Sequence, residues 1–272
     1  MKIIAVTGGS GFLGRTLIKR LKGKVRVLAR NEGLLSLLKQ EFPKIEVITG
    51  DVADRWSVKK LMQGAEEVYH LAAVKGVDIA ERDVMQAVKT NVIGSLNVIE
   101  ESLITKPKIL VAISTDKSSQ VSGIYGASKL IMEGLMREAE RINPKTKYRV
   151  VKYGNVLYST GSVLCKWRNS MQAGNGVSIT DPNMTRFFWT VDEAIDLIFK
   201  CISNSKDATP YIPKMKAMRM GDLLKAMMAK YGSVPVNIIG NRGGENLHET
   251  MDGKVYSNQV EQFSINEIMK KI

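Results

Sequence analysis

Two residues of the chain have the types and the spacing for proton transfer from an alcohol. Tyr125 and Lys129 lie four positions apart, so on a helix both side chains share one face. An ammonium group beside a phenol favours the phenolate, and we expect it to lower the tyrosine pKa from about 10 toward neutrality. Such a tyrosine accepts a proton from a substrate hydroxyl while a bound cofactor accepts the hydride. A surface pair without function has the same spacing, so the surrounding sequence must decide.

A glycine-rich turn near the N-terminus has the pattern of a phosphate-binding loop. Gly8, Gly11 and Gly14 directly follow a short apolar segment and open a segment with helical periodicity. A strand-to-helix turn without side chains lets the backbone approach a pyrophosphate, which the helix N-terminus binds through its N–H groups and its dipole. The order of strand, turn and helix makes the pattern specific for a dinucleotide. We therefore expect cofactor contacts from Gly8, Ser10, Gly11, Phe12, Leu13 and Gly14.

The ends of the next strands indicate which dinucleotide binds. An acid at the end of the second strand would bind the ribose hydroxyls of NAD, but this chain has Arg30 there. A guanidinium pairs with a 2′-phosphate, so we expect NADP rather than NAD; a solvated surface arginine is the alternative. Asp51 and Val52 follow the third strand, where they suit the adenine amino group and ring. Ala72 and Ala73 follow the fourth, where small residues let the backbone run beside the cofactor.

Short apolar segments alternate with helical ones over the first 153 residues. We expect strands at 3–6, 24–28, 45–48, 68–73, 109–113 and 149–153, and helices at 12–21, 34–42, 58–62, 85–103 and 125–141. This alternation predicts β-α-β units with parallel strands that helices cover on both faces. The predicted fold class is therefore α/β, a doubly wound parallel sheet of the Rossmann type.

The pattern changes after Tyr153. Residues 154–182 are rich in Gly, Asn, Ser, Asp and Pro, and one clear helix is expected at 191–202. A further β-α-β piece is expected from residues 211–212, 221–231 and 234–239. We therefore divide the chain into a cofactor-binding domain, residues 1–153 and about 187–212, and a small C-terminal substrate-binding lobe, about 154–186 and 213–272.

Composition excludes several classes of protein. The 272 residues carry 40 Lys and Arg against 27 Asp and Glu, a net charge of +13 that would suit nucleic acid. The basic residues are scattered and interleaved with acids, so a nucleic-acid partner is not expected. Two cysteines and two histidines without ligand spacing predict free thiols and no metal site. Since no apolar run is long enough to cross a membrane, we expect a cytoplasmic protein.

Further segments resemble those of a known family. The glycine turn, Asp51, Ala72-Ala73, Asn91 and the Tyr125/Lys129 pair resemble the extended short-chain dehydrogenase/reductases, which implies a cofactor contact for Asn91. Residues 1 to about 252 are similar to the inverting UDP-N-acetylglucosamine 4,6-dehydratases of polysaccharide biosynthesis. The segments that carry this similarity are Ser114-Thr115-Asp116-Lys117, Lys152-Tyr153-Gly154-Asn155-Val156, Gly161-Ser162-Val163, residues 180–187, and Gly244-Glu245-Asn246-Leu247-His248-Glu249.

The resemblance implies a catalytic role for each residue of the Thr-Asp-Lys triplet. Oxidation of a sugar at C4 gives a ketone that acidifies the C5 proton, which Lys117 would remove if it is neutral among other cations. Asp116, protonated through burial, would donate to the departing C6 hydroxyl, and Thr115 would bind O4 beside Tyr125. Return of the hydride to C6 and reprotonation of C5 on the opposite face then invert that centre. A solvated ion pair of Asp116 and Lys117 is the alternative interpretation.

Other matched positions imply contacts with a UDP-sugar, of which UDP-N-acetylglucosamine is the favoured one. Asn155 and the turn at Ser162 and Val163 would meet the nucleotide diphosphate. Lys75 stands where the family has a basic residue near the sugar. The resemblance thus implies that the substrate lies between the strand ends and the C-terminal lobe.

The C-terminal matched segment departs from the family in places. Arg242 and Glu245 would bind the pyrophosphate and the uridine ribose, although Gly243 replaces the usual proline. Arg186 is either a substrate ligand or a structural residue, and His248 is expected to be structural. The chain also ends before typical members do. A homo-oligomer is expected, but the missing segment leaves its assembly state open.

Three functions remain open from the sequence. The first is the inverting 4,6-dehydratase, which the complete combination of Thr115, Asp116, Lys117, Tyr125 and Lys129 favours. The second is an epimerase or reductase on the same scaffold, which would use the tyrosine and its lysine but not Asp116 or Lys117. The third is a catalytically silent NADP-binding scaffold that touches RNA through its positive surface. Replacement of Lys117 separates the first two functions.

Overall fold

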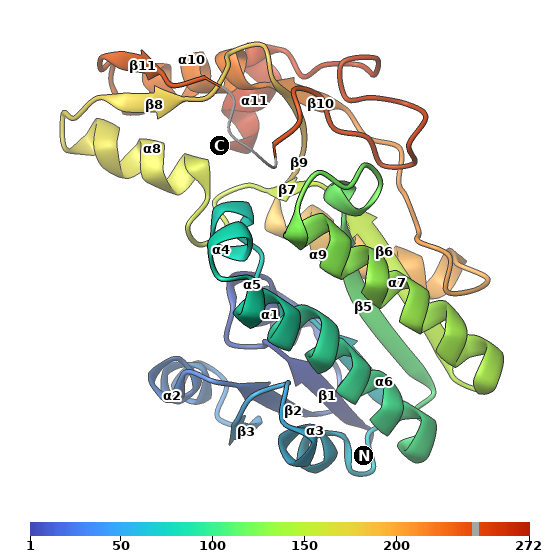
Figure 1. Cartoon of the computed structure of the whole chain (residues 1–272). Helices are drawn as coiled ribbons and strands as arrows, with labels where there is room; N and C mark the ends of the chain where they lie inside the picture. Colours follow the sequence, from blue (N-terminus) through green and yellow to red (C-terminus); the bar gives the residue numbers. More distant parts are fainter. Residues whose placement is uncertain (241–244) are drawn as a thin grey trace.

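A six-stranded parallel sheet organises the first half of the chain (Figure 1). The computed structural model describes residues 1–240 and 245–272. The strands are β1 (Ile3–Thr7), β2 (Lys24–Ala29), β3 (Glu46–Thr49), β4 (Glu67–His70), β5 (Ile109–Thr115) and β6 (Lys147–Tyr153), in the spatial order β3-β2-β1-β4-β5-β6. The chain reverses its direction of winding between β1 and β4, where α/β sheets bind ligands at the strand ends. The predicted doubly wound α/β fold is confirmed.

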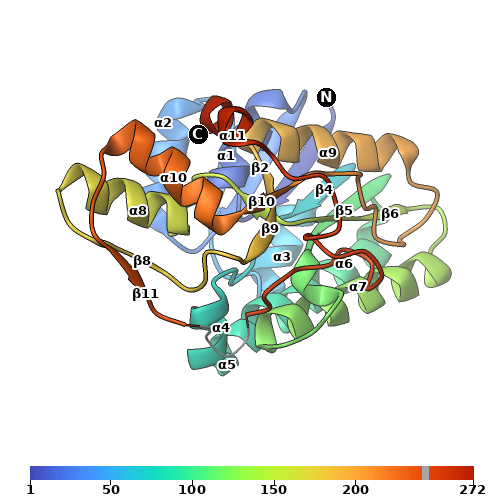
Figure 2. The ribbon, with the colours of Figure 1, turned by 90° about the horizontal axis from the view of Figure 1, so that it is seen from above.

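Helices cover both faces of this sheet, as Figure 2 shows. One face packs against α1 (Phe12–Arg20), α2 (Glu32–Glu41) and α9 (Val191–Asn204). The other packs against α3 (Arg55–Met62), α6 (Gly94–Thr105) and α7 (Ile124–Ile142). Central β1 is therefore apolar without alternation, and Ile4, Ala5 and Val6 are fully buried.

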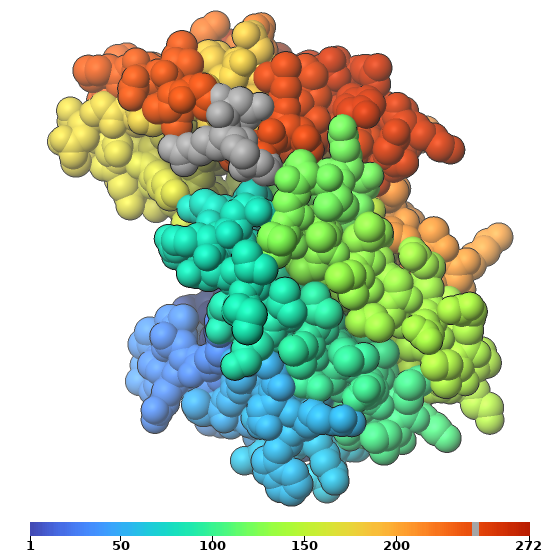
Figure 3. Space-filling view, viewed as in Figure 1, coloured from blue at the N-terminus to red at the C-terminus, as the bar shows by residue number. Residues whose placement is uncertain are grey.

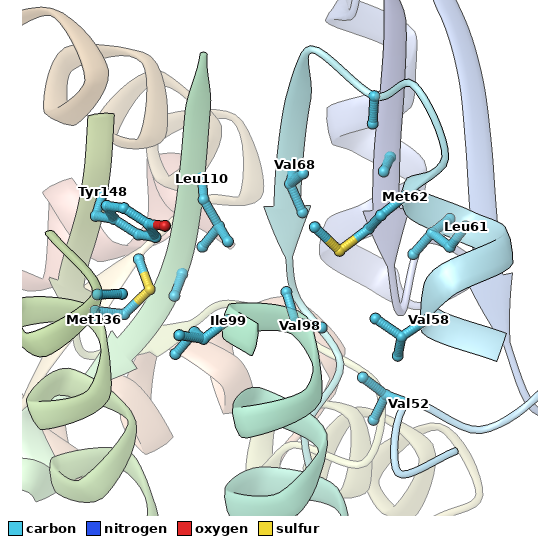
Figure 4. Close-up of a cluster of buried hydrophobic side chains, with 14 of the residues drawn as sticks. Val52, Val58, Leu61, Met62, Val68, Val98, Ile99, Leu110, Met136 and Tyr148 are labelled. Carbon is cyan, nitrogen blue, oxygen red and sulfur yellow. The ribbon is translucent and has the colours of Figure 1, made fainter. Parts of the chain in front are cut away.

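The core on the α3–α6–α7 face is shown in Figure 4. Val58 and Met62 of α3 meet Val98 of α6 beneath the sheet, all fully buried. Tyr148 of β6 lies in the same core, and its hydroxyl pairs with the Ser102 hydroxyl of α6 at 2.9 Å. Burial of the tyrosine is therefore compatible with its polar atom, because a partner is supplied.

A smaller lobe lies at the carboxyl end of the sheet (Figures 1 and 3). Its helices are α8 (Val163–Gln172), α10 (Met220–Tyr231) and α11 (Ile265–Lys271), and they share a separate apolar core. Two small sheets complete it: β7 (Asn155–Val156), β9 (Thr185–Trp189) and β10 (Ala217–Arg219), then β8 (Val177–Ile179) with β11 (Val236–Ile238). The lobe thus covers the carboxyl ends of the strands, where the predicted site residues lie.

The predicted β-α-β piece in the last quarter of the chain is wrong. Tyr211 makes only an isolated parallel bridge to Val151, because Pro210 and Pro213 flank it and cannot donate to a ladder. β10 pairs antiparallel with β9, while β11 pairs with β8, so α10 does not connect two strands of one sheet. The helix α10 and the strand β11 lie at the predicted positions, but the strands do not pair as predicted.

The long helix predicted at 85–103 is interrupted. The chain forms α4 (Val77–Arg82) and α5 (Val84–Ala87), then a π-helical turn, η1 (Val88–Ile93), before α6. The wider turn lies where Asn91 binds the backbone of Val74. The remaining predicted elements occur with ends shifted by a few residues.

Candidate active site

A cavity of about 950 Å³ extends from the glycine turn to the lobe. Most of the residues predicted from sequence to bind cofactor or substrate line it, although they come from distant parts of the chain. They are Gly8, Ser10, Gly11, Phe12, Leu13, Gly14, Arg30, Asp51, Val52, Ala72, Ala73, Lys75, Thr115, Lys117, Tyr125, Lys129, Asn155, Ser162, Val163, Arg186 and Glu245. Of the predicted residues that the structure describes, Asn91 and Asp116 lie outside the lining.

The glycine turn brings backbone close to the end of β4. Gly8 has φ +68°, and a side chain there would place a Cβ 2.8 Å from the Ala72 nitrogen. Its own N–H donates to the Leu28 carbonyl, which leaves the turn tightly packed between β2 and β4. Only glycine satisfies both the positive φ and the close approach. The N-terminus of α1 therefore opens into the cavity without a side chain in the way.

Arg30 lies at the outer edge of the cavity. Its guanidinium is 3.9 Å from an Asp51 carboxylate oxygen, and 55% of its side chain is exposed. The other Asp51 oxygen accepts from the backbone of Ala53. Because the ion pair is long and exposed, the arginine remains available to an anion that enters the cavity.

Asn91 has a different place from the one the resemblance implies. Its side chain is buried, and its amide accepts from the Val74 N–H and donates to the Val74 carbonyl. The same amide donates to the Ser128 hydroxyl at 3.0 Å. Asn91 therefore does not line the cavity; it joins the segment after β4 to α7, the helix that carries Tyr125 and Lys129.

Tyr125 and Lys129 both line the cavity from the first turns of α7. The Lys129 ammonium donates to the Ile113 carbonyl at 2.9 Å, and burial lowers its pKa to about 8 against the opposing effect of Glu133. The pKa of Tyr125 is raised, because burial outweighs the Lys117 ammonium and the Thr115 hydroxyl. The expected lowering of that pKa by Lys129 is therefore absent from this structure.

Gly126 sets how closely α7 approaches the triplet, a role that was not predicted. A Cβ at this position would lie 2.1 Å from the Lys117 carbonyl oxygen. The helix therefore packs directly against the backbone of the turn η2 (Asp116–Ser118). Gly126 directly follows Tyr125 in the sequence, which could have drawn attention to it. The contact with the Lys117 backbone could not be predicted, because no sequence pattern indicates it.

Asp116 is fully buried, one layer behind the cavity wall. Its Oδ1 accepts from the Thr115 hydroxyl at 2.8 Å and from the Lys117 backbone N–H at 2.9 Å. Its Oδ2 has no hydrogen-bond partner within residues 1–240 and 245–272. The interpretation as a solvated ion pair is thus wrong, because the carboxylate is buried. It is separated from the cavity by Thr115 and Lys117, which line the cavity and donate hydrogen bonds to Asp116.

Lys117 lies among carboxylates rather than among the cations that were expected. Its Nζ is 3.1 Å from Asp116 Oδ1 and 3.6 Å from Glu249 Oε1. Burial lowers the pKa of the ammonium, but the two carboxylates outweigh burial and raise it. Glu249 belongs to a segment quoted for the resemblance, yet no role was predicted for it because its partner is remote in sequence.

The lobe contributes the N-terminus of α8 to the opposite wall. Ser162 precedes this helix, and its buried hydroxyl has no partner among the described residues. Val163 begins the helix, and Asn155 lines the same wall with its amide 3.4 Å from the Phe187 carbonyl. Lys75 lines the cavity from the segment after β4, and burial lowers its pKa. Helix dipole, hydroxyl and ammonium together suit an anionic group.

Arg186 is structural in this fold, whatever it binds besides. Its guanidinium donates to the carbonyls of Thr185, Asn246 and Leu247, which ties β9 to the segment that carries Glu249. His248 is structural as expected, with Nδ1 2.8 Å from the Thr185 hydroxyl. The predicted ligand Arg242 lies outside the described residues.

Within residues 1–240 and 245–272, no cluster of His, Cys, Asp and Glu has the size to hold a metal ion. None of the helices in the same ranges combines the length and apolar character that a membrane crossing requires.

Comparisons with known proteins agree with this geometry. The family of polysaccharide biosynthesis proteins matches residues 4–271. The chain is 37% identical over 266 residues to an uncharacterized membrane protein of Methanocaldococcus jannaschii, covering 92% of this chain and 80% of that one. It is 34% identical over 260 residues to an inverting UDP-N-acetylglucosamine 4,6-dehydratase of Campylobacter jejuni, and 31% identical over 264 residues to a UDP-glucose 4-epimerase of Rickettsia bellii. Both matches cover 92% of this chain and 77% of the relative.

The same fold occurs in a solved structure with nucleotide ligands. A UDP-glucuronic acid 4-epimerase from Bacillus cereus, in complex with UDP-glucuronic acid and NAD, superposes with a TM-score of 0.84 at 20% identity. The match covers 100% of this chain and 97% of that one, which shows a shared architecture. With the sheet, the glycine turn and the Tyr125/Lys129 pair in place, this chain belongs to the polysaccharide biosynthesis protein family and has the fold of the extended short-chain dehydrogenase/reductases.

Proposed function

We propose that the chain is an NADP-dependent UDP-N-acetylglucosamine 4,6-dehydratase that inverts C5. One observation carries the proposal: a single cavity joins the glycine turn, Tyr125 and Lys129, Lys117, and the N-terminus of α8. The cavity therefore has room for a dinucleotide along the sheet edge and a nucleotide sugar beneath the lobe. The relative from Campylobacter jejuni has this activity by name and is similar over most of the chain.

The residues present fit a nicotinamide dinucleotide. At Gly8 the turn packs so closely against the backbone of Ala72 that a Cβ would not fit. The absence of a side chain leaves the N-terminus of α1 accessible from the cavity. Arg30 is the group that would bind a 2′-phosphate, and its exposed position favours NADP over NAD in this proposal. When bound, such a cofactor would take a hydride from C4 of the sugar and return it to C6.

The protein's own groups would handle the protons. Tyr125, in its phenolate form, would accept the proton of the C4 hydroxyl, with Thr115 binding the same oxygen. The ketone acidifies the C5 proton, which Lys117 would remove as an amine. Asp116, buried behind Thr115 and Lys117, would supply the proton for the departing C6 hydroxyl after it moves toward the cavity or through the Thr115 hydroxyl.

The far wall would hold the nucleotide end of the substrate. The α8 N-terminus with Ser162 offers donors to a diphosphate, and Lys75 offers a cation near the sugar. Glu245 lines the cavity with a carboxylate suited to ribose hydroxyls, 3.5 Å from the Thr180 hydroxyl. Arg242 remains part of the proposal from sequence alone. A cytoplasmic location and a homo-oligomer are also proposed on that basis.

One incubation tests this function. The purified protein is mixed with UDP-N-acetylglucosamine in deuterated water, and the sugar is followed by NMR and mass spectrometry. The expected product has lost water, carries deuterium at C5 and has the inverted configuration there. Recovery of the sugar without water loss or deuterium would contradict the proposal.

A UDP-sugar 4-epimerase is the second candidate, because relatives named as UDP-glucose 4-epimerases are nearly as similar. This reaction needs Tyr125 and Lys129 but no proton transfer at C5. UDP-glucose is therefore included in a parallel incubation. Formation of the C4 epimer without deuterium at C5, in a Lys117→Ala variant as well as in the wild type, would favour this candidate.

A further inference from the structure

Glu249 is a buried carboxylate in the wall of the cavity. Its Oε1 lies between two cations, 3.6 Å from Lys117 Nζ and 3.7 Å from Arg186 Nε. Its side chain is 2% exposed, and its Oε2 is 3.5 Å from the Asn246 amide. The backbone N–H of Glu249 donates to the Ser257 hydroxyl at 2.9 Å. The carboxylate thus lies between Lys117 and Arg186, and Ser257 anchors the backbone that carries it.

The ionisable groups around Lys117 come from five elements. Asp116 of η2 is 3.1 Å away, Tyr125 approaches from α7, Arg186 from β9 and Glu249 from the C-terminal segment. Glu81 of α4 lines a small crevice together with Lys117. Two close carboxylates therefore face one ammonium, against one guanidinium that opposes it.

This arrangement stabilises the wrong charge for a base. An ammonium has no lone pair, so Lys117 must lose a proton before it takes one from carbon. Asp116 Oδ1 accepts from the backbone N–H and from the Nζ of Lys117 and belongs to the same turn, whereas Glu249 comes from a segment 132 positions later. Glu249 is accordingly the partner that the lobe adds to a pair already present in the turn.

Given the proposed function, in which Lys117 removes the C5 proton, we propose that Glu249 is a positioning residue that controls the charge of Lys117. The carboxylate holds the ammonium against Asp116 and keeps the lysine inert as a base at neutral pH in the substrate-free site. Both side chains line the cavity, so a sugar that enters meets the pair rather than a free amine. The lobe thereby governs when the triplet becomes reactive.

A titration of Lys117 tests this directly and needs no substrate. The protein is prepared with lysine that carries ¹³C at Cε, whose chemical shift reports the charge of Nζ, and the Lys117 resonance is assigned by its absence in Lys117→Ala. In the wild type we expect the ammonium signal to persist beyond the ordinary lysine pKa of about 10.5, because two carboxylates face the ammonium. In Glu249→Gln, the midpoint should fall by about one pH unit, since one of two close carboxylates is gone.

Matched variants separate control of charge from a structural role. Glu66→Gln removes the same charge from an exposed ion pair with Lys108 and should leave the Lys117 midpoint unchanged. Glu249→Asp keeps the charge at a greater distance and should lower the midpoint by a smaller amount. If Glu249→Gln does not fold, Glu249→Asp decides. A folded variant of Glu249 whose Lys117 midpoint is unchanged or higher would overturn the proposal.

The result is independent of whether the proposed function holds. If the wild type releases no water from UDP-N-acetylglucosamine, the dehydratase proposal fails while the titration is still readable. If it is active, the acid limb of the rate of C5 deuterium exchange should move down by the same amount, about tenfold faster at a given pH in Glu249→Gln. An active wild type with an unshifted limb in that variant would contradict the role of Glu249 alone.

Discussion

Two buried acid–base clusters flank the turn that carries the triplet, and they differ in one respect. In the first, Glu133 Oε1 accepts from the Ser118 hydroxyl at 2.6 Å and lies 3.2 Å from the Lys152 ammonium. In the second, Asp116 and Glu249 face Lys117. Both contain a lysine with less than one fifth of its side chain exposed. Glu133, Lys152 and Ser118 do not line the cavity, whereas Lys117 and Glu249 do.

Under the proposed function, the difference separates a stabilising cluster from one that takes part in the reaction. Lys152 also donates to Ser119 at 3.0 Å, and Ser114 donates to Glu133, so the first cluster is closed by neutral hydroxyls. In the second, Asp116 Oδ2 lacks a partner within the described residues, and the ion pairs to Lys117 are open to the cavity. Residue type alone therefore does not identify a functional pair; satisfaction and access to the cavity do.

Replacement of Lys117 should give the largest effect on activity. Lys117→Ala removes the base from the open cluster, and we expect product formation from the UDP-sugar to fall about a thousandfold. Thermal stability should fall as well in this variant, because Asp116 and Glu249 are left buried without the ammonium that pairs with them. Lys117→Arg keeps the charge but cannot act as a base near neutral pH, so it should lose as much activity. If either variant retained activity, Lys117 would not be the base, and the second cluster would have a structural role like the first.

Replacement of Lys152 should give the largest effect on stability. Lys152→Met leaves Glu133 charged and buried without its partner, which costs about 3–5 kcal/mol of unfolding free energy. The double variant Glu133→Leu/Lys152→Met should recover most of that loss, because no charge remains buried. Urea denaturation measures both. Lys108→Met, which breaks an exposed pair with Glu66, should cost less than about 1 kcal/mol. If Lys152→Met were as stable as the wild type, the ion pair with Glu133 would not be needed to stabilise the fold.

The sequence predicted the elements of the sheet half better than those of the lobe. Runs such as Ile3–Thr7 are buried on both faces, so their apolar character marks a parallel strand without reference to the rest of the chain. In the lobe, β10 and β11 are three residues long each and pair with strands far away in sequence. Short segments of that kind carry no periodicity of their own, so β10 was not predicted and the pairing of β11 was predicted wrongly.

For the site, residue positions were predictable but charge states were not. Local motifs placed Tyr125, Lys129 and Lys117 on one cavity, since each follows a strand end. The pKa of Lys117, however, depends on Glu249, and that of Tyr125 depends on burial. Asn91 was expected to contact the cofactor, but its side chain binds the backbone of Val74 and does not line the cavity. A backbone partner of this kind cannot be recognised from a pattern of side chains. Tertiary neighbours decide such properties.

His70 provides a third buried group, and its effect should be on pH stability. The histidine is enclosed between the Thr7 and Ser95 hydroxyls, and burial lowers its pKa to about 3. The unfolded chain binds a proton near pH 6.5 and the folded protein does not, so stability is present above that pH and is lost as pH falls. The expected loss is up to about 1.4 kcal/mol per pH unit between pH 6 and 4. His70→Asn should flatten this slope in urea denaturation; an unchanged slope would assign it to other groups.

Ser119 connects the two clusters, and its replacement should give the smallest effect. Its hydroxyl accepts from Lys152 and donates to the carbonyl of Met251, two residues beyond Glu249. Ser119→Ala removes both bonds but leaves Glu133 beside Lys152, so we expect a loss of about 1 kcal/mol in unfolding free energy and less than about threefold in activity. Ser203→Ala, which removes an exposed bond to Phe199, is the matched control and should be nearly neutral. If Ser119→Ala instead abolished activity while stability stayed at the wild-type value, the closed cluster would be transmitting position to Glu249, and the two clusters would have to be treated as one functional unit.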